Sequence, residues 1–160
     1  MEIFEKPVLE GIRKKLLKNR ITVAVAESVT GGLIQFAFSN MPDASQFFQG
    51  GICAYNLGQK YKHLNVDPIH AEEVNSVSGQ VAREMALNVA RMFNSDLGIG
   101  VTGFATPVPE SNNNIYAFYS ISKNGREVKK GKISIKSAEA ALAQQIFTNK
   151  ILALFYRTIS

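Results

Sequence analysis

The stretch ITVAVAESVTGG, residues 21–32, decides how the rest of the chain is interpreted. Its first half, residues 21–26, is a short apolar run rich in β-branched side chains, which predicts a strand buried in the middle of a sheet. A polar turn with two glycines ends this run, and the apolar segment 33–38 that follows suits a buried helix. A strand, a tight turn and a helix in this order are typical of an α/β protein.

The alternation of strands and helices continues outward from this stretch. The spacing of apolar residues predicts an opening helix at 7–19, strands at 50–55 and 97–102, a short helix within 56–62, a helix at 79–93 capped by Ser78, and a closing helix from the cap Ser137 to Arg157. Residues 115–122 and 127–136 alternate around Asn124-Gly125, which is a strong hairpin signal. We therefore expect a three-layer α/β/α sandwich with a mostly parallel central sheet and an antiparallel hairpin.

The length and composition indicate one ordinary globular domain over residues 1–160. A chain of 160 residues, 46% hydrophobic and 19% charged, is long enough to bury a hydrophobic core without disulfides or structural metal ions. The acidic, mixed start of the chain does not resemble a secretory signal, no stretch is long and apolar enough to cross a bilayer, and we expect a cytoplasmic protein. A single cysteine, Cys53, excludes an intrachain disulfide, and with two histidines the chain offers no zinc site.

The net charge of +5 is compatible with phosphate-bearing partners. The lysines are spread along the helices and the last strand rather than gathered in a dense basic run. Aromatic residues are not interleaved with them as in RNA-binding motifs. We therefore expect a small-molecule ligand, and neither a nucleic acid nor a membrane as partner.

Polar residues follow three of the predicted strands at their carboxyl ends, where open α/β sheets bind ligands. These candidate site residues are Glu27, Ser28 and Thr30 before Gly31 and Gly32, then Tyr55 with Lys60 five residues later, and then Thr102 before Gly103.

The residues alone leave the role of Ser28 open. At a helix start, free backbone N–H groups and the helix dipole stabilise an oxyanion or a phosphate, so that Ser28 is a candidate nucleophile or ligand contact. The alternative is that Ser28 or Thr30 caps the helix and that the glycines allow close packing. Spacing by itself favours the cap.

The candidate bases for such a serine are few. Neither His63 nor His70 lies in a context that suggests a Ser-His-Asp arrangement, and we expect both at the surface. A desolvated lysine beside a hydroxyl can take its proton, which makes Lys60 a candidate, although a lone lysine in a polar segment is more often exposed. Tyr55 either orients a ligand or packs locally, and Cys53 is expected to be a small buried residue within a strand.

Taken together, these blocks resemble the CinA C-terminal domain family, whose single-domain members include bacterial nicotinamide mononucleotide deamidases. The matching blocks are AESVTGG at 26–32 for the family's AESCTGG, FQGGICAYN at 48–56 with Lys60, LNV at 64–66, VS at 77–78 with VAREMA at 81–86, and VTGFATP at 101–107. The likeness extends from about residue 8 to residue 103.

The resemblance implies an amidohydrolase that converts nicotinamide mononucleotide and water to nicotinic acid mononucleotide and ammonia. Carried over by position, Ser28 is the nucleophile and Lys60 its general base. Tyr55 and Thr102 hold the substrate or relay a proton, and the turn at Gly31 and Gly32 supports an anionic intermediate or a phosphate. The family implies a homo-oligomer and no metal or other cofactor.

The chain departs from the family pattern close to these residues. Segment 108–114 has no glycine where the family is glycine-rich. Glu139 and Ala143 stand where the family places arginines at the start of the last helix, one of which is expected to meet the substrate. Because arginine suits bidentate phosphate contacts, Lys136 nearby is only a partial substitute. These departures suggest an alternative, a non-catalytic nucleotide-binding or oligomeric member.

Overall fold

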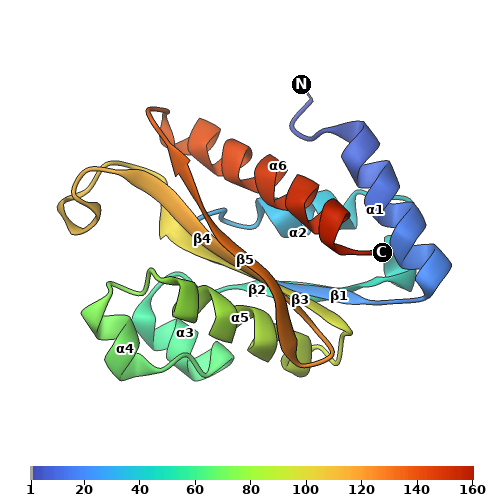
Figure 1. The fold of residues 1–160 in the computed structure, drawn as a ribbon, viewed down its shortest axis with the longest axis horizontal. Helices are drawn as coiled ribbons and strands as arrows, with labels where there is room; N and C mark the ends of the chain where they lie inside the picture. Colours follow the sequence, from blue (N-terminus) through green and yellow to red (C-terminus); the bar gives the residue numbers. More distant parts are fainter. Residues whose placement is uncertain (1) are drawn as a thin grey trace.

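A five-stranded mixed sheet forms the middle layer of the computed structural model, which describes residues 2–160 (Figure 1). The strand order is β2-β1-β3-β4-β5. The strands are β1 (Val23–Glu27), β2 (Phe48–Cys53), β3 (Leu97–Phe104), β4 (Ile115–Lys123) and β5 (Arg126–Ile135). Strands β2, β1 and β3 are parallel, and the β4–β5 hairpin pairs antiparallel with β3.

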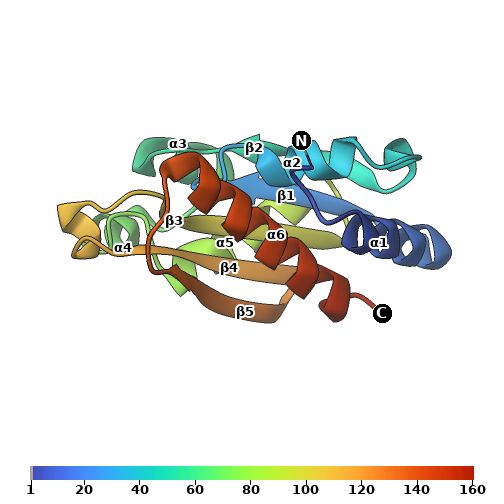
Figure 2. The same ribbon diagram turned by 90° about the horizontal axis from the view of Figure 1, so that it is seen from above.

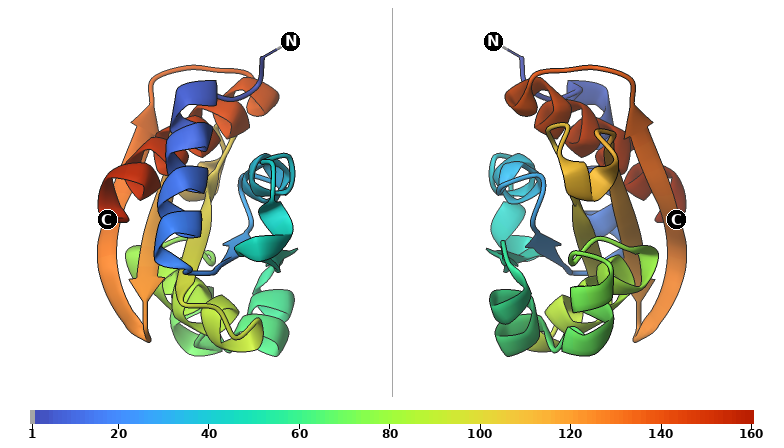
Figure 3. Two further views of the ribbon diagram at one scale, coloured as in Figure 1. Left: turned by 90° about the vertical axis from the view of Figure 1, so that its right-hand side faces the viewer. Right: turned by 90° about the vertical axis from the view of Figure 1, so that its left-hand side faces the viewer.

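Helices cover both faces of this sheet. They are α1 (Lys6–Asn19), α2 (Leu33–Ser39), α3 (Leu57–Leu64), α4 (Pro68–Glu73), α5 (Gly79–Met92) and α6 (Ala140–Thr158). Helices α1, α2 and α6 lie on one face, and α3, α4 and α5 lie on the other, as the end-on views show (Figure 3). Figure 2 looks onto the first face, with α6 crossing in front of the strands. The predicted three-layer α/β/α sandwich is confirmed.

The position of strand β1 explains why residues 23–26 are all apolar. Val23 and Val25 join the core formed with α1, α2 and α6. Ala24 and Ala26, which point to the opposite face, join the core beneath α5. Because all five residues of β1 are fully buried between two helical layers, the usual alternation of apolar and polar positions is absent.

Two glycines let helix α5 approach strand β3. A Cβ atom at Gly98 would collide with the backbone of Ala86, and one at Gly100 with the backbone of Ala82. Both glycines lie in the β3 segment that pairs with β1. The small residues of β3 therefore set the close α5–β3 packing that fixes the sheet beneath the candidate site.

Most predicted elements are present, with bounds shifted by a few residues, and the short helix within 56–62 is α3. The predicted strand at 50–55 is β2 and ends at Cys53, so Tyr55 lies two residues beyond it. Helix α4 was not predicted. The predicted cap Ser137 is wrong, because α6 begins at Ala140 and its N-cap position is Glu139, without a side-chain capping bond.

Two further expectations concern single side chains. Ser78 caps α5 as predicted, since its hydroxyl accepts a hydrogen bond from Val81 N. Cys53 was expected to be buried and is exposed instead. The reason is its place at the end of the edge strand β2, where only one neighbouring strand covers it. Within residues 2–160, no helix is long and apolar enough to cross a membrane.

Candidate functional site

A cavity of about 630 Å³ lies at the carboxyl ends of the parallel strands. Ser28 lines it directly after β1, Tyr55 and Lys60 line it after β2, and Thr102 and Gly103 line it near the end of β3. In Figure 1 this is the end of the sheet that carries the loop between β3 and β4. The structure thus brings together residues from all three predicted strand ends.

Lys60 and Ser28 form a direct pair in the wall of the cavity. Lys60 Nζ donates hydrogen bonds to Ser28 Oγ at 3.0 Å and to the carbonyl oxygen of Ala54, also at 3.0 Å. The lysine is 1% exposed, so the surface position that its polar segment favours is excluded. Helix α3 explains this placement: it is capped by Asn56, and Lys60 lies on its buried side together with Leu64.

Burial changes the protonation of this lysine. Desolvation lowers the pKa of Lys60 from its ordinary value of 10.5 to about 8, because the charged ammonium loses its water shell. A lysine with this pKa is partly neutral at neutral and mildly alkaline pH. It can therefore accept a proton from a hydroxyl at hydrogen-bonding distance, as a general base must.

Glu27 is the residue that caps helix α2. Its fully buried carboxylate accepts hydrogen bonds from Thr30 Oγ1 at 2.6 Å and from the backbone N–H groups of Ile34 and Gln35, both at 2.9 Å. The hydroxyls of Ser28 and Thr30, which the spacing favours as caps, do not cap this helix. The carboxylate satisfies two N–H groups of the first helical turn and complements the helix dipole, which holds the turn containing Ser28 in place.

The glycines of the turn shape the backbone rather than line the cavity. Gly31 and Gly32 have φ angles of +60° and +103°, which glycine adopts without strain. Glu27, Thr30, Gly31 and Gly32 are all outside the cavity wall. The backbone N–H groups of Val29 and Thr30 make no hydrogen bond with any part of the chain from residue 2 to 160, which leaves them free beside Ser28.

Strand β3 contributes Thr102 and Gly103. The Thr102 hydroxyl donates to the carbonyl of Ser76 at 2.8 Å, tying β3 to the segment before α5 and leaving the hydroxyl oxygen as an acceptor. A Cβ at Gly103 would collide with the backbone of Tyr116 and Ala117 on β4. Tyr55 is 75% exposed and lies at the rim, where its ring can contact a ligand that enters.

Helix α6 supplies part of the wall that the sequence did not reveal. Ala140 and Gln144 line the cavity, and Gln144 Nε2 donates to the carbonyl of Val29 at 3.0 Å. The resemblance expects arginines at positions 139 and 143. Here Glu139 precedes the first turn of α6, and Ala143 is fully buried. No sequence signal marks Gln144, because its contact joins residues 115 positions apart.

Two carboxylates were also missed by the sequence analysis. Glu72 of α4 and Glu110, in the short helical turn Pro109–Ser111, line the cavity, and both are exposed. The charged side chains of the wall are therefore Lys60 and these two glutamates. A second cavity of about 620 Å³ lies between β5 and α6 and contains none of the predicted site residues.

The histidines lie apart from the serine and lysine pair. His63 is exposed on α3 and its Nε2 is 3.0 Å from Gln59 Oε1. His70 is half-buried, and its Nε2 is 2.8 Å from the hydroxyl of the helix cap Ser78. Over residues 2–160, histidine, cysteine and acidic side chains form no group of three or more of the kind that holds a metal ion.

The fold and the cavity together define a class of protein. It is a three-layer α/β protein with a buried lysine and a serine at the carboxyl ends of its strands. The chain belongs to the CinA C-terminal domain family, whose model matches residues 5–157. It is 34% identical to protein MG115 of Mycoplasma genitalium over 145 residues, which cover 91% of this chain and 92% of that protein.

Longer relatives share only part of their length with this chain. The CinA-like protein of Dictyoglomus turgidum is 40% identical over 103 residues, 64% of this chain, and the match spans 25% of that protein. The chain thus spans about a quarter of the length of such relatives.

Solved structures of CinA-type proteins share the fold. The competence or damage-inducible protein of Enterobacter asburiae superposes with a TM-score of 0.89 at 21% identity, covering 96% of each chain. The CinA superfamily protein of Escherichia coli superposes with a TM-score of 0.87 at 22% identity, covering 94% of this chain and 88% of that one. At these identities the likeness establishes the arrangement of helices and strands.

Proposed function

We propose that this chain hydrolyses a carboxamide, with Ser28 as nucleophile and Lys60 as general base. The observation that carries this proposal is the 3.0 Å hydrogen bond between Lys60 Nζ and Ser28 Oγ, made by a buried lysine whose pKa is lowered to about 8. The family resemblance adds a reaction, the conversion of nicotinamide mononucleotide and water to nicotinic acid mononucleotide and ammonia. It also adds a homo-oligomeric state, which light scattering on the purified protein measures.

The proposed reaction has two halves. The neutral amine of Lys60 takes the proton of Ser28 as Oγ attacks the carbonyl carbon of the amide, and a tetrahedral intermediate forms. The C–N bond then breaks, and the departing nitrogen receives the proton from Lys60 and leaves as ammonia. Water, deprotonated by Lys60, attacks the resulting ester, releasing the carboxylic acid and returning the proton to Ser28.

Two features of the cavity wall support this chemistry. The Ala54 carbonyl accepts a hydrogen bond from Lys60 and thereby fixes the direction of the amine relative to Ser28. The free N–H group of Val29, which lines the cavity, follows the serine and is suited to stabilise the oxyanion of the intermediate. In this mechanism Glu27 and Thr30 act by holding the turn, while Tyr55, Thr102 and Gly103 contact the substrate.

Ammonia release from nicotinamide mononucleotide tests the proposal. We expect release by the parent protein, and a loss of at least about 100-fold in Ser28→Ala and in Lys60→Met, the size typical of a missing nucleophile or base. The matched control is Lys62→Met, which removes an exposed lysine of the same helix. Activity that survives Ser28→Ala would overturn the assignment of the nucleophile.

The second candidate function is a non-catalytic member that binds a nucleotide. Glu139 and Ala143 favour it, because neither can hold a phosphate as the family's arginines are expected to do. Calorimetry with nicotinamide mononucleotide separates the two functions. Binding without ammonia release, under conditions in which a relative with the family's arginines releases ammonia, would support the second function over the first.

A further inference from the structure

We propose that Ser76 is a specificity-determining residue of the cavity, and that its hydroxyl binds a hydroxyl group on the sugar of a nucleoside-type carboxamide. Neither the sequence patterns nor the family resemblance marks this serine. The inference rests on the proposed amide hydrolysis and adds a substrate contact to the same site. It is carried by the burial of Ser76, by its backbone conformation and by its unused hydrogen-bonding capacity.

The side chain of Ser76 lies in the wall of the cavity with its hydroxyl unused. Ser76 is 9% exposed and is one of the residues that line the cavity. Within residues 2–160 its Oγ makes no hydrogen bond, whereas its backbone N–H and carbonyl both do. The only fully enclosed side-chain polar atom without a partner in this part of the chain is Asn149 Oδ1, in the wall of the second cavity. Ser76 Oγ is therefore open to the cavity and available to a ligand.

The backbone of Ser76 has a conformation that serine seldom adopts. The φ angles of Asn75 and Ser76 are +53° and +61°, both in the left-handed region. Asn75 belongs to the end of helix α4, because the next residue donates its N–H to the Ala71 carbonyl at 2.7 Å, as in a Schellman motif. This motif needs one left-handed residue and leaves the second, Ser76, unexplained. Such strain is typical of residues that serve a binding site.

A side chain of β3 holds Ser76 beside the candidate nucleophile. Thr102 Oγ1 donates a hydrogen bond of 2.8 Å to the carbonyl of Ser76. The last pair of the parallel β1–β3 ladder is Ala26 with Gly100. Ser28 and Thr102 each follow two residues later, at neighbouring strand ends. Ser76 is thus attached to the strand end next to the one that carries the serine of the proposed reaction.

The groups around Ser76 suit the hydroxyls of a sugar. Ser76 Oγ can donate and accept, and Thr102 Oγ1 can still accept. The exposed side-chain amide of Asn75 is also in the wall and makes no hydrogen bond within residues 2–160. Together these neutral groups donate and accept, as sugar hydroxyls do, whereas anionic groups only accept and bind more strongly to cations. With the amide at Ser28, the part of the substrate in front of Ser76 is therefore a sugar, with or without a phosphate attached to it.

Calorimetry in the Ser28→Ala background tests the inference without turnover. The probes are nicotinamide mononucleotide and its 2′-deoxy and 3′-deoxy analogues, each of which lacks one sugar hydroxyl. We expect Ser76→Ala to weaken mononucleotide binding about tenfold, the scale of one hydrogen bond. It should change little the affinity for the analogue that lacks the hydroxyl bound by Ser76, because that contact is already missing. Equal weakening for all three compounds, no weakening for any of them, or no binding of the mononucleotide would overturn the inference.

Ser76→Gly and Ser45→Ala are the matched controls. The glycine lacks the hydroxyl but adopts a positive φ without strain, so we expect the same loss of affinity with a higher midpoint of urea unfolding than in Ser76→Ala. Ser45→Ala removes an exposed hydroxyl outside the cavity and should leave the affinity unchanged. Ser76→Ala itself should keep the unfolding midpoint, because the hydroxyl has no partner within residues 2–160. A lower midpoint with unchanged affinities would show that Ser76 is structural and would overturn the inference.

Ammonia release with Ser28 intact separates this inference from the proposed function. If both hold, Ser76→Ala raises KM for the mononucleotide about tenfold and leaves kcat unchanged. Selective loss of affinity in Ser76→Ala, in a protein that releases no ammonia, would support the sugar contact and overturn the hydrolase. Ammonia release with the same KM in the parent and in Ser76→Ala would support the hydrolase and overturn the sugar contact.

Discussion

The side-chain amide of Gln144 donates a hydrogen bond of 3.0 Å to the carbonyl of Val29, joining the last helix of the chain to the residue that follows Ser28. A Cβ at Gly31 would approach the same amide nitrogen to 3.3 Å, so the amide is seated tightly against the turn. Helix α6 therefore positions the turn that carries the candidate nucleophile, although it lies far from it in sequence.

Gln144→Leu removes this bond and leaves the Val29 carbonyl without its partner. We expect a loss of about 1 kcal/mol in the free energy of unfolding and a lower kcat for ammonia release, because the serine is held less firmly. The matched control is Gln145→Leu, which removes a similar bond to the Ile3 carbonyl outside the site. Equal effects of the two variants on kcat would contradict the positioning role.

The rate of ammonia release should depend on the protonation of Lys60. Its pKa of about 8 means that the neutral amine, which is the form that accepts a proton, increases as the pH rises from 6 to 9. We therefore expect kcat to rise through this range and to level off above pH 8 to 9. A rate that falls or stays flat, in protein shown by circular dichroism to remain folded, would exclude Lys60 as the base.

The free energy of unfolding should also depend on the protonation of Lys60, and it should rise with pH. The pKa of Lys60 lies near 8 in the folded chain and at its ordinary 10.5 when unfolded, so between these values the unfolded state binds more protons. Stability then rises with pH across this window. Urea unfolding at pH 7 to 10.5 should show the parent gaining stability relative to Lys60→Met. The exposed Lys62→Met should follow the parent.

Residues 21–32 were sufficient to predict the β1–α2 unit, because an apolar β-branched run and paired glycines have few other interpretations. The grouping of Ser28, Tyr55 and Thr102 also followed from the sequence, since parallel strands place their carboxyl ends together. Both predictions could be made without knowing which residues the side chains contact.

The burial of Lys60 could not be predicted from its polar segment. It depends on α3 packing against α4 and α5 and on the Ala54 carbonyl that receives the amine, both of which are tertiary contacts. The capping of α2 was misjudged for a similar reason. Glu27 reaches forward seven and eight residues to Ile34 and Gln35, beyond the spacing of ordinary cap motifs.

Glu27→Gln tests this capping directly. The amide keeps the shape of the side chain but loses its negative charge and brings an NH2 group toward N–H donors, so we expect a loss of about 1 to 3 kcal/mol in the free energy of unfolding. Glu73→Gln, at an exposed position on α4, is the control and should change stability little. If denaturant unfolding gives the same small loss for both, the buried carboxylate does not hold the turn.

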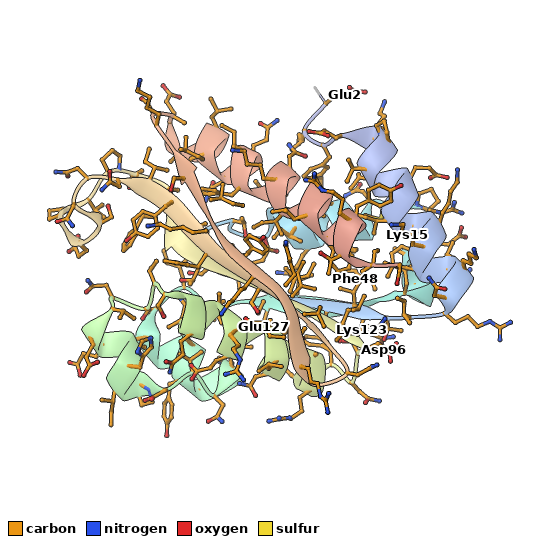
Figure 4. All side chains as sticks on the ribbon, viewed as in Figure 1. Glu2, Lys15, Phe48, Asp96, Lys123 and Glu127 are labelled. Atoms are coloured by element: carbon orange, nitrogen blue, oxygen red, sulfur yellow. The ribbon has the colours of Figure 1, made fainter. Side chains whose placement is uncertain are left out.

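Lys15, labelled in Figure 4 near the carboxyl end of α6, should stabilise the fold away from the site. Its Nζ donates to the carbonyls of Tyr156 and Ile159, both at 2.8 Å, and lies 4.2 Å from the centre of the Tyr156 ring. A cation at a helix C-terminus satisfies free carbonyls and the helix dipole. Lys15→Met should therefore lower the free energy of unfolding by about 1 to 2 kcal/mol.

The control for Lys15→Met is the neighbouring exposed Lys14, whose contact is an ion pair with Glu10 at 3.5 Å. Because exposed ion pairs contribute little, Lys14→Met should cost less than about 0.5 kcal/mol. Ammonia release should be unchanged in both variants, since α1 does not reach the cavity. A loss in Lys15→Met no larger than in Lys14→Met would show that α6 is held by its apolar face alone, through residues such as Phe147, Ile151 and Phe155.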